Sequence, residues 1–126
     1  MLFFFLVKPR PLDVGVLIDS STTVGRTQWE QLKSFVKSVS NSFAPSWPGN
    51  HIGLITYGRD AEVAFLFNSL RNEQLNPSAV NRLIDTIPYR DRGERRLVEA
   101  LQLANSQLFS SRGGARPKAR QVFMQG

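Results

Sequence analysis

The chain has 126 residues, of which 41% are hydrophobic and 21% charged, a composition that excludes disorder as its main state. It has no cysteine, which excludes disulfides, a thiol nucleophile and a cysteine-ligated metal, and no apolar run is long enough for a membrane span. The net charge of +6 is concentrated in residues 90–96 and 112–120. Neither segment carries a nucleic-acid-binding signature or interleaved aromatic residues, so we expect no nucleic acid partner, whereas an acidic glycan fits the charge.

The first ten residues form a segment of their own, apolar from Met1 to Val7 and then basic, with Lys8 and Arg10 beside prolines. The apolar run is short for a signal peptide, lacks a preceding basic residue and has no small-residue cleavage site. We therefore expect an N-terminal extension at residues 1–10, without a convincing signal peptide, followed by one domain over residues 11–126.

The first half of this domain begins with a strand. Leu12–Ile18 is almost continuously apolar and ends at Asp19, which is typical of a parallel strand covered on both faces. A loop rich in hydroxyl groups follows, and residues 27–43 then form an amphipathic helix. His51–Tyr57 is expected to be a second buried strand. The inner stripe of the helix is expected to consist of Trp29, Leu32, Phe35, Val36, Val39 and Phe43.

The second half adds an edge strand, two helices and a further strand. Ala61–Phe67 alternates as an antiparallel edge strand, and Asn76-Pro77 caps a helix that extends to about Ile87. A strand begins at Gln121. The order predicts a Rossmann-like α/β fold, a mainly parallel central sheet with helices on both faces and one antiparallel edge strand. Between these elements, a third helix is marked by Leu97, Ala100, Leu101, Ala104 and Leu108.

A candidate metal site follows the first strand. Asp19 lies at the carboxyl end of that strand, where sites form in open α/β sheets, and Ser21 and Thr23 follow at alternate positions. One carboxylate and two hydroxyls are hard oxygen donors, which suit Mg²⁺ or Mn²⁺ better than zinc. Serine and threonine are also common at helix starts, so capping is the alternative interpretation of the same residues.

The sequence around this candidate site resembles the opening of a von Willebrand factor type A domain. In that family an apolar strand leads into a D-x-S-x-S motif and a helix, and Asp19, Ser21 and Thr23 stand at the three motif positions. The segment HIGLITYG at residues 51–58 resembles the family's second strand. The resemblance covers about residues 11–126 and is strongest to extracellular-matrix members, such as matrilin-like domains. It implies a partial domain, because the family's later strands and closing helix have no counterpart here.

The resemblance also implies a degenerate metal-ion-dependent adhesion site. In the family, a Thr and an Asp on two later loops complete the site. Those positions fall on Arg95 and Gln125 in this chain. The resemblance therefore implies that Mg²⁺ or Mn²⁺ binds weakly or not at all. We hypothesise that the guanidinium of Arg95 takes the place of the cation and pairs with Asp19; the alternative is that Arg95 points into solvent and the site is vestigial.

The function that the resemblance implies is a non-enzymatic protein-interaction or adhesion module, extracellular or at the cell surface, with a protein ligand of the matrix or cell surface. The candidate partner-binding residues are Arg90, Arg92, Arg95 and Arg96. Two alternatives remain, a truncated scaffold that binds nothing and a haloacid-dehalogenase-like phosphotransferase. The second lacks an acid–base donor, because Ser21 stands where that family's D-x-D-x-T motif has its second carboxylate. His51, the single histidine, is expected to be structural or solvated.

Overall fold

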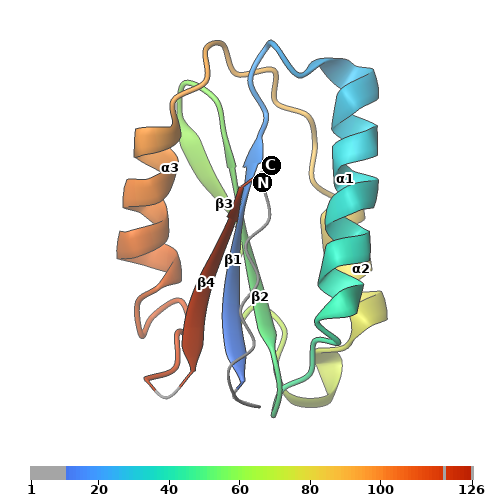
Figure 1. Cartoon of the computed structure of the whole chain (residues 1–126), viewed down its shortest axis with the longest axis vertical. Coiled ribbons are helices and arrows are strands. Elements are labelled where there is room, and N and C mark those ends of the chain that lie inside the picture. The colour runs from blue at the N-terminus through green and yellow to red at the C-terminus, as the bar shows by residue number, and fades with distance from the viewer. Residues whose placement is uncertain (1–10, 118, 126) are drawn as a thin grey trace.

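The computed structural model describes residues 11–117 and 119–125, which form a four-stranded sheet with helices on both faces (Figure 1). β1 pairs in parallel with β2 and β4, whereas β3 runs antiparallel to β2. This arrangement confirms the predicted α/β sheet with one antiparallel edge. The strand order is β3-β2-β1-β4, with β1 at Leu12–Asp19, β2 at His51–Tyr57, β3 at Ala61–Phe65 and β4 at Arg120–Gln125.

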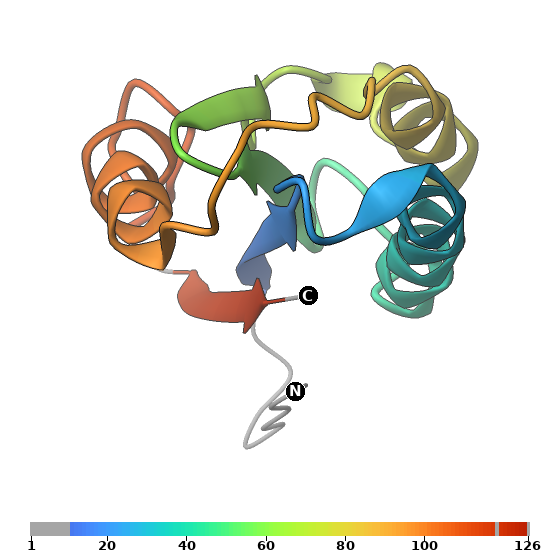
Figure 2. The ribbon, with the colours of Figure 1, turned by 90° about the horizontal axis from the view of Figure 1, so that it is seen from above.

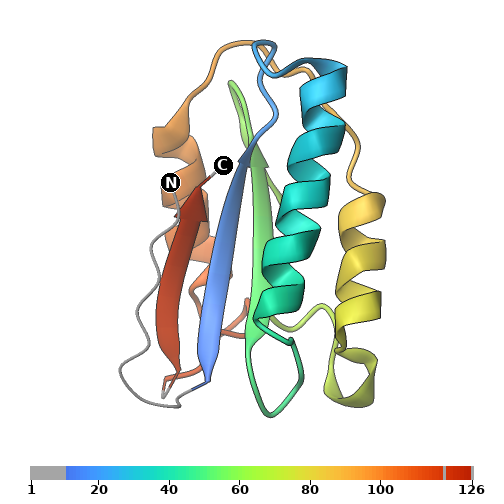
Figure 3. The same cartoon turned by 45° about the vertical axis from the view of Figure 1, so that its right-hand side comes forward.

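The helices lie where the alternation of strands and helices predicts. α1 (Gly25–Ser42) and α2 (Pro77–Asp85) cover one face of the sheet, and α3 (Leu97–Leu103) covers the other (Figures 1 and 3). A short 3₁₀ turn, η1 (Asn72–Gln74), precedes α2, and a π-helical turn, η2 (Ala104–Leu108), continues α3. Together α3 and η2 cover the range predicted for the third helix, but the winding changes from α to π at Ala104. The predicted extension at residues 1–10 lies outside the described residues.

β1 is buried along its whole length because both of its faces are covered. Val14, Val16 and Ile18 pack on the side of α1 and α2, whereas Leu17 belongs to a second cluster with Ile55 on the side of α3. Alternate residues of a strand point to opposite faces, so a strand with two covered faces needs apolar residues at nearly every position. This explains the continuous apolar run in the sequence.

The predicted inner stripe of α1 is wrong at one position. Trp29, Val36 and Phe43 are buried, but the side chain of Phe35 is 53% exposed. Phe35 lies about 100° around the helix from Val36, away from the line that faces the sheet. That line includes the buried Lys33, whose Nζ reaches the carbonyl oxygen of Asp85 at 3.4 Å.

α3 and η2 lie close to the sheet because the sheet has two glycines, side by side, on the face that η2 covers. Gly15 of β1 and Gly53 of β2 are register partners on the same face. A Cβ on Gly53 would clash with Leu108, and a Cβ on Gly15 would lie 2.8 Å from the ring of Phe109. The two glycines therefore form the floor on which η2 packs. Leu101, one of the residues that mark the predicted third helix, is 42% exposed.

Three loops meet at the carboxyl ends of β1 and β2. They are the β1–α1 loop, the β2–β3 turn and the long loop between α2 and α3, which crosses over this end of the sheet in Figure 2. Asp19, Ser21, Thr23 and the predicted basic segment at residues 90–96 all lie in this region. In the part of the chain that the structure describes, no helix has both the length and the apolar character required to cross a membrane.

Candidate functional site

Asp19 is the last residue of β1, and its position is fixed by both backbone and side-chain bonds. The carboxylate is almost fully buried, and its Oδ1 accepts the N–H of Ser21 at 2.8 Å. One residue further, the N–H of Ser20 donates to the carbonyl oxygen of Tyr57 at the end of β2, at 2.6 Å. The loop that follows β1 is therefore bonded to the neighbouring strand, and the carboxylate of Asp19 is held at the carboxyl end of β1.

The loop between α2 and α3 is joined to the β1–α1 loop by several hydrogen bonds. The N–H of Thr22 donates to Gly93 O at 2.8 Å, and the N–H of Arg92 donates to Ser20 O at 3.1 Å. The hydroxyl of Tyr89 donates to Ser21 O at 2.7 Å and accepts the N–H of Gly25 at 3.1 Å. Sequence reasoning missed this role of Tyr89, because a single tyrosine after a helix has no pattern that marks it.

Arg95 forms an ion pair with Asp19. Its Nε lies 2.6 Å from Oδ2 of Asp19, on the side of the carboxylate that does not bond Ser21. This contact is the pairing that the sequence hypothesis expected, and it is not the alternative in which Arg95 points freely into solvent. The side chain of Arg95 is 59% exposed, whereas that of Asp19 is 7% exposed. The guanidinium thus covers a buried carboxylate from the solvent side.

The two hydroxyl groups of the motif bond each other. Ser21 is buried, and its Oγ lies 2.8 Å from Oγ1 of the exposed Thr23. The groups available to a divalent cation at this point are therefore one carboxylate, already paired with a guanidinium, and two mutually bonded hydroxyls. Within the described residues, no three His, Cys, Asp or Glu side chains come together as a metal-binding group. Gln125 ends β4, whose register places it beside Leu17.

The other candidate arginines are paired with carboxylates of the same chain. Arg90 contacts Glu62 at 3.1 Å, and Arg92 contacts the second oxygen of Glu62 at 2.8 Å. Arg96 bonds Glu94 through Nη2 at 2.6 Å and Nε at 2.9 Å, and this hydrogen bonding raises the pKa of Arg96 above its usual range. The loop is therefore less basic as a surface than its sequence indicates.

An open groove lies beside the Asp19–Arg95 pair, along the first two turns of α1. Its volume is about 400 Å³. Apart from the ion pair itself, its walls are uncharged, since they combine amide and aliphatic side chains. The groove is lined by Asp19, Val24, Gln28, Gln31, Leu32 and Arg95.

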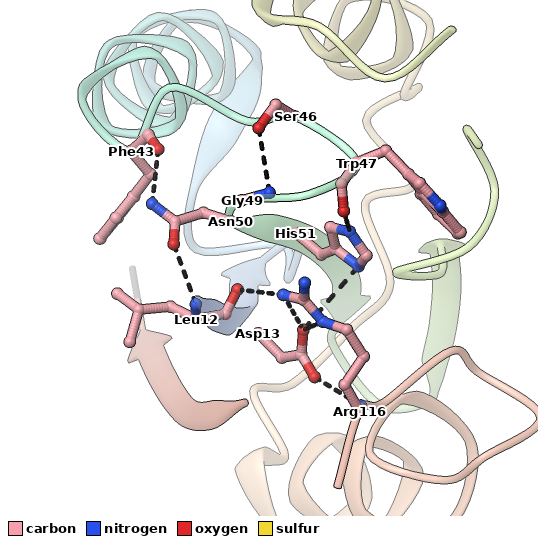
Figure 4. A network of polar contacts seen from close by, with 9 residues as sticks. All are labelled: Leu12, Asp13, Phe43, Ser46, Trp47, Gly49, Asn50, His51 and Arg116. Atoms are coloured by element: carbon pink, nitrogen blue, oxygen red, sulfur yellow. Dashed lines mark hydrogen bonds and ion pairs between the residues drawn. The ribbon is translucent and has the colours of Figure 1, made fainter. Parts of the chain in front are cut away.

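A second polar cluster lies at the opposite end of β1 (Figure 4). Asp13 is fully buried, and Arg116 bonds its two oxygens through the backbone N–H at 2.8 Å and through Nε at 2.9 Å. The same guanidinium donates to Leu12 O at 3.0 Å. Sequence reasoning missed this pair, because Asp13 and Arg116 are 103 positions apart and each is a single charged residue.

His51 belongs to this cluster and has a structural role. Its ring is 2% exposed and stacks on Trp47, with centroids 4.8 Å apart, and Nε2 lies 2.8 Å from Trp47 O. Nδ1 lies 3.9 Å from Asp13 Oδ1. Burial lowers the pKa of His51, and the nearby charge of Arg116 lowers it further; the bond to Trp47 and the charge of Asp13 act in the opposite direction. Burial, the largest of these effects, favours the neutral form of His51.

Comparison with known sequences assigns the fold to a family. The family model of the von Willebrand factor type A domain matches residues 13–124, and the chain therefore belongs to this family. The matched range includes Asp19, Ser21 and Thr23, the loop at residues 90–96 and most of β4.

Curated relatives are extracellular-matrix chains and related proteins. The mouse collagen alpha-1(XX) chain is 27% identical over 122 residues, which is 96% of this chain and 9% of the relative. Mouse von Willebrand factor A domain-containing protein 2 is 28% identical over 87% of this chain and 14% of its own length. Mouse matrilin-3 is 26% identical over 86% of this chain and 22% of its own length. The chain thus spans less than a quarter of these relatives.

Solved structures agree with this fold. Proximal thread matrix protein 1 of the mussel byssus superposes with a TM-score of 0.83 at 20% identity, over 92% of this chain and 30% of that one. A second structure of the same mussel protein, described as having a zinc-occupied MIDAS motif, also gives a TM-score of 0.83 at 19% identity. These likenesses concern the fold, since the identities are low.

Proposed function

We propose that the chain is a non-enzymatic protein-interaction module of the extracellular matrix or cell surface, in which Arg95 replaces the metal ion of the adhesion site. The observation that carries the proposal is the 2.6 Å contact between Arg95 Nε and Asp19 Oδ2. A guanidinium at that distance neutralises the one carboxylate of the motif and repels a divalent cation. The donor set therefore does not fit Mg²⁺ or Mn²⁺.

The extracellular location is supported by the relatives, which are collagen and matrilin chains. The protein ligand is supported by the family and by the groove beside Asp19 and Arg95, which provides a recessed surface of mixed polarity.

An enzymatic role has little support, because the second position of the motif is Ser21, whose hydroxyl bonds Thr23 and supplies no acid for proton transfer.

Binding to purified matrix proteins tests this function. Fibrillar collagen, fibronectin and laminin are immobilised separately, and the chain is applied at increasing concentration in EDTA and again in millimolar Mg²⁺. We expect saturable binding to at least one of them, with the same midpoint in both solutions, because no metal takes part. A chain that binds none of them saturably contradicts the module. Binding that disappears in EDTA contradicts the role given to Arg95.

A further inference from the structure

We propose that the amino end of the sheet carries a binding site for a sulfated glycan, at the opposite end of β1 from Asp19 and Arg95. The site is formed by the segment between β3 and α2, at residues 66–76, and by the segment from η2 to the start of β4, at residues 110–120. Both segments lie at the lower end of the molecule in Figures 1 and 3. The position of the site is independent of the proposed function, whereas the choice of an extracellular glycan rests on the location given there.

The excess positive charge of the chain gathers at this end. Residues 66–76 and 110–120 contain five basic residues and one acidic residue, Glu73. At the carboxyl end, residues 19–23, 58–62 and 88–99 contain five basic residues and six acidic ones, and four of those arginines form ion pairs. A polyanion is therefore attracted to the amino end of the sheet and not to the loop at residues 90–96.

Arg71 and Arg112 are the free cations of this surface. Both are exposed, and within residues 11–117 and 119–125 neither forms an ion pair with an acidic side chain. Arg116 differs, because the buried Asp13 holds its guanidinium. An arginine without a carboxylate partner keeps donors for anionic oxygens, which a guanidinium binds through two parallel hydrogen bonds.

Asn68 joins the two segments that carry these arginines. Its carbonyl oxygen accepts the Nε–H of Arg71 at 3.3 Å, and its Nδ2 donates to the carbonyl oxygen of Arg112 at 3.1 Å. Gly114 packs directly on Asn68: a Cβ at Gly114 would lie 2.7 Å from Asn68 Cβ, and the φ of +90° favours glycine. Because 44 positions separate Asn68 from Arg112, the site exists only in the folded chain.

The second segment continues with two further basic residues, Lys118 and Arg120. β4 begins at Arg120, whose register partner on β1 is Leu12, so the backbone places Arg120 at the same end of the sheet. A ligand with several negative charges in a row suits such a series of cations better than a single anion does.

The surface lacks the apolar anchor of a membrane-binding site. The large hydrophobic residues exposed in the described chain are Phe35, Val98 and Leu101, and none of them lies in residues 66–76 or 110–120. Membrane-surface sites combine basic residues with exposed apolar ones. Here the exposed neighbours of the arginines include the hydroxyls of Ser69 and Ser111, which can bond the hydroxyl and sulfate groups of a glycan.

The test is a titration of the full chain with a heparin hexasaccharide, followed by NMR. A hyaluronan hexasaccharide, which carries carboxylates but no sulfate, is the control ligand. We expect saturable shifts of the Arg71 and Arg112 Nε–Hε signals with heparin, and much weaker binding of hyaluronan. The affinity for heparin should fall steeply between about 50 and 200 mM NaCl, because a polyanion releases bound counterions when cations neutralise it.

Two double variants locate the site. Arg71→Gln combined with Arg112→Gln should weaken heparin binding about tenfold or more, since two charge-assisted contacts are lost. Arg26→Gln combined with Arg59→Gln removes the same charge from exposed positions in the first turn of α1 and in the β2–β3 turn. Because these positions lie at the carboxyl end, where salt screens their effect on a distant ligand, this control should lose less than about threefold.

Several results would overturn the inference. Equal binding of heparin and hyaluronan would contradict a sulfated ligand, and equal losses in the two double variants would indicate a general effect of net charge. Tighter binding to vesicles of phosphatidylcholine and phosphatidylserine than to heparin would assign the surface to a lipid. Heparin binding as expected, with no saturable binding to any matrix protein, would overturn the proposed function alone. Matrix-protein binding without heparin binding would overturn this inference alone.

Discussion

Individual side chains decide what each end of β1 can do. At the carboxyl end, Arg95 neutralises Asp19 from the solvent side. At the amino end, Arg116 neutralises the fully buried Asp13, with His51 alongside. In both places a guanidinium compensates a buried carboxylate, which would otherwise be costly to desolvate. The two ends differ in exposure, since the side chain of Arg116 is mostly covered whereas that of Arg95 is not.

His51 makes the stability of the fold depend on pH. Its pKa is lowered in the folded chain, chiefly by burial, from an unfolded value of 6.5. Below pH 6.5 the unfolded chain binds a proton that the folded chain does not, so the free energy of unfolding falls as the pH decreases. We expect the free energy of unfolding to be lower at pH 5.5 than at pH 7.5, with a slope of at most about 1.4 kcal/mol per pH unit.

Urea unfolding at the two pH values measures this loss. The control is His51→Gln, whose amide can still donate to Trp47 O but does not titrate. His51 is the single histidine of the sequence, so the variant removes every side chain with an unperturbed pKa in this range. An equal loss of stability in the unmodified chain and in His51→Gln would show that another group is responsible.

At the scale of elements, the packing of η2 on the sheet depends on the register pair Gly15 and Gly53. Leu108 lies directly over Gly53, so the two positions share one volume. The turn from α-helix to π-helix at residues 104–108 lies at this contact. It follows that the size of residue 53 and the size of residue 108 are energetically coupled.

A double-mutant cycle tests this coupling. Gly53→Ala should destabilise the fold by about 1–3 kcal/mol through overpacking, and Leu108→Ala by about 2–5 kcal/mol through the cavity it leaves. The double variant should lose clearly less than the sum, because the added methyl enters the vacated space. The control pair is Gly53→Ala with Leu101→Ala at an exposed position, where the losses should add. Additive losses in both pairs, measured by chemical denaturation, would contradict the shared volume.

The elements were largely predictable from sequence, whereas particular side chains were not. Strands β1 and β2 were predicted to within one residue, because continuous apolar runs identify buried strands. Phe35 was assigned to the inner stripe of α1 wrongly, since spacing alone does not show how wide a strip of the helix the sheet covers. The pairing of Arg95 with Asp19 was expected because a family resemblance brought their positions together. The Asp13–Arg116 pair had no such guide, and only the folded chain brings it together.

At the scale of the whole molecule, positive charge is distributed differently from what the sequence indicates. The segment at residues 90–96 is strongly basic in composition, but its arginines are interleaved with Glu62, Glu94 and Asp19 in the fold. The net charge of +6 therefore does not form a continuous basic surface at the site.

The central claim is that Arg95 takes the place of the metal ion, and thermal unfolding in EDTA and in millimolar Mg²⁺ tests it most directly. Ligands that bind only the folded state raise its stability, so the midpoint of unfolding reports metal binding without an adhesion assay. Three proteins are compared: the unmodified chain, Arg95→Thr combined with Gln125→Asp, and the control Arg96→Thr. We predict that Mg²⁺ raises the midpoint of the double variant alone. A midpoint of the unmodified chain that rises with Mg²⁺ would contradict the claim, because it would show that the site binds metal with Arg95 in place.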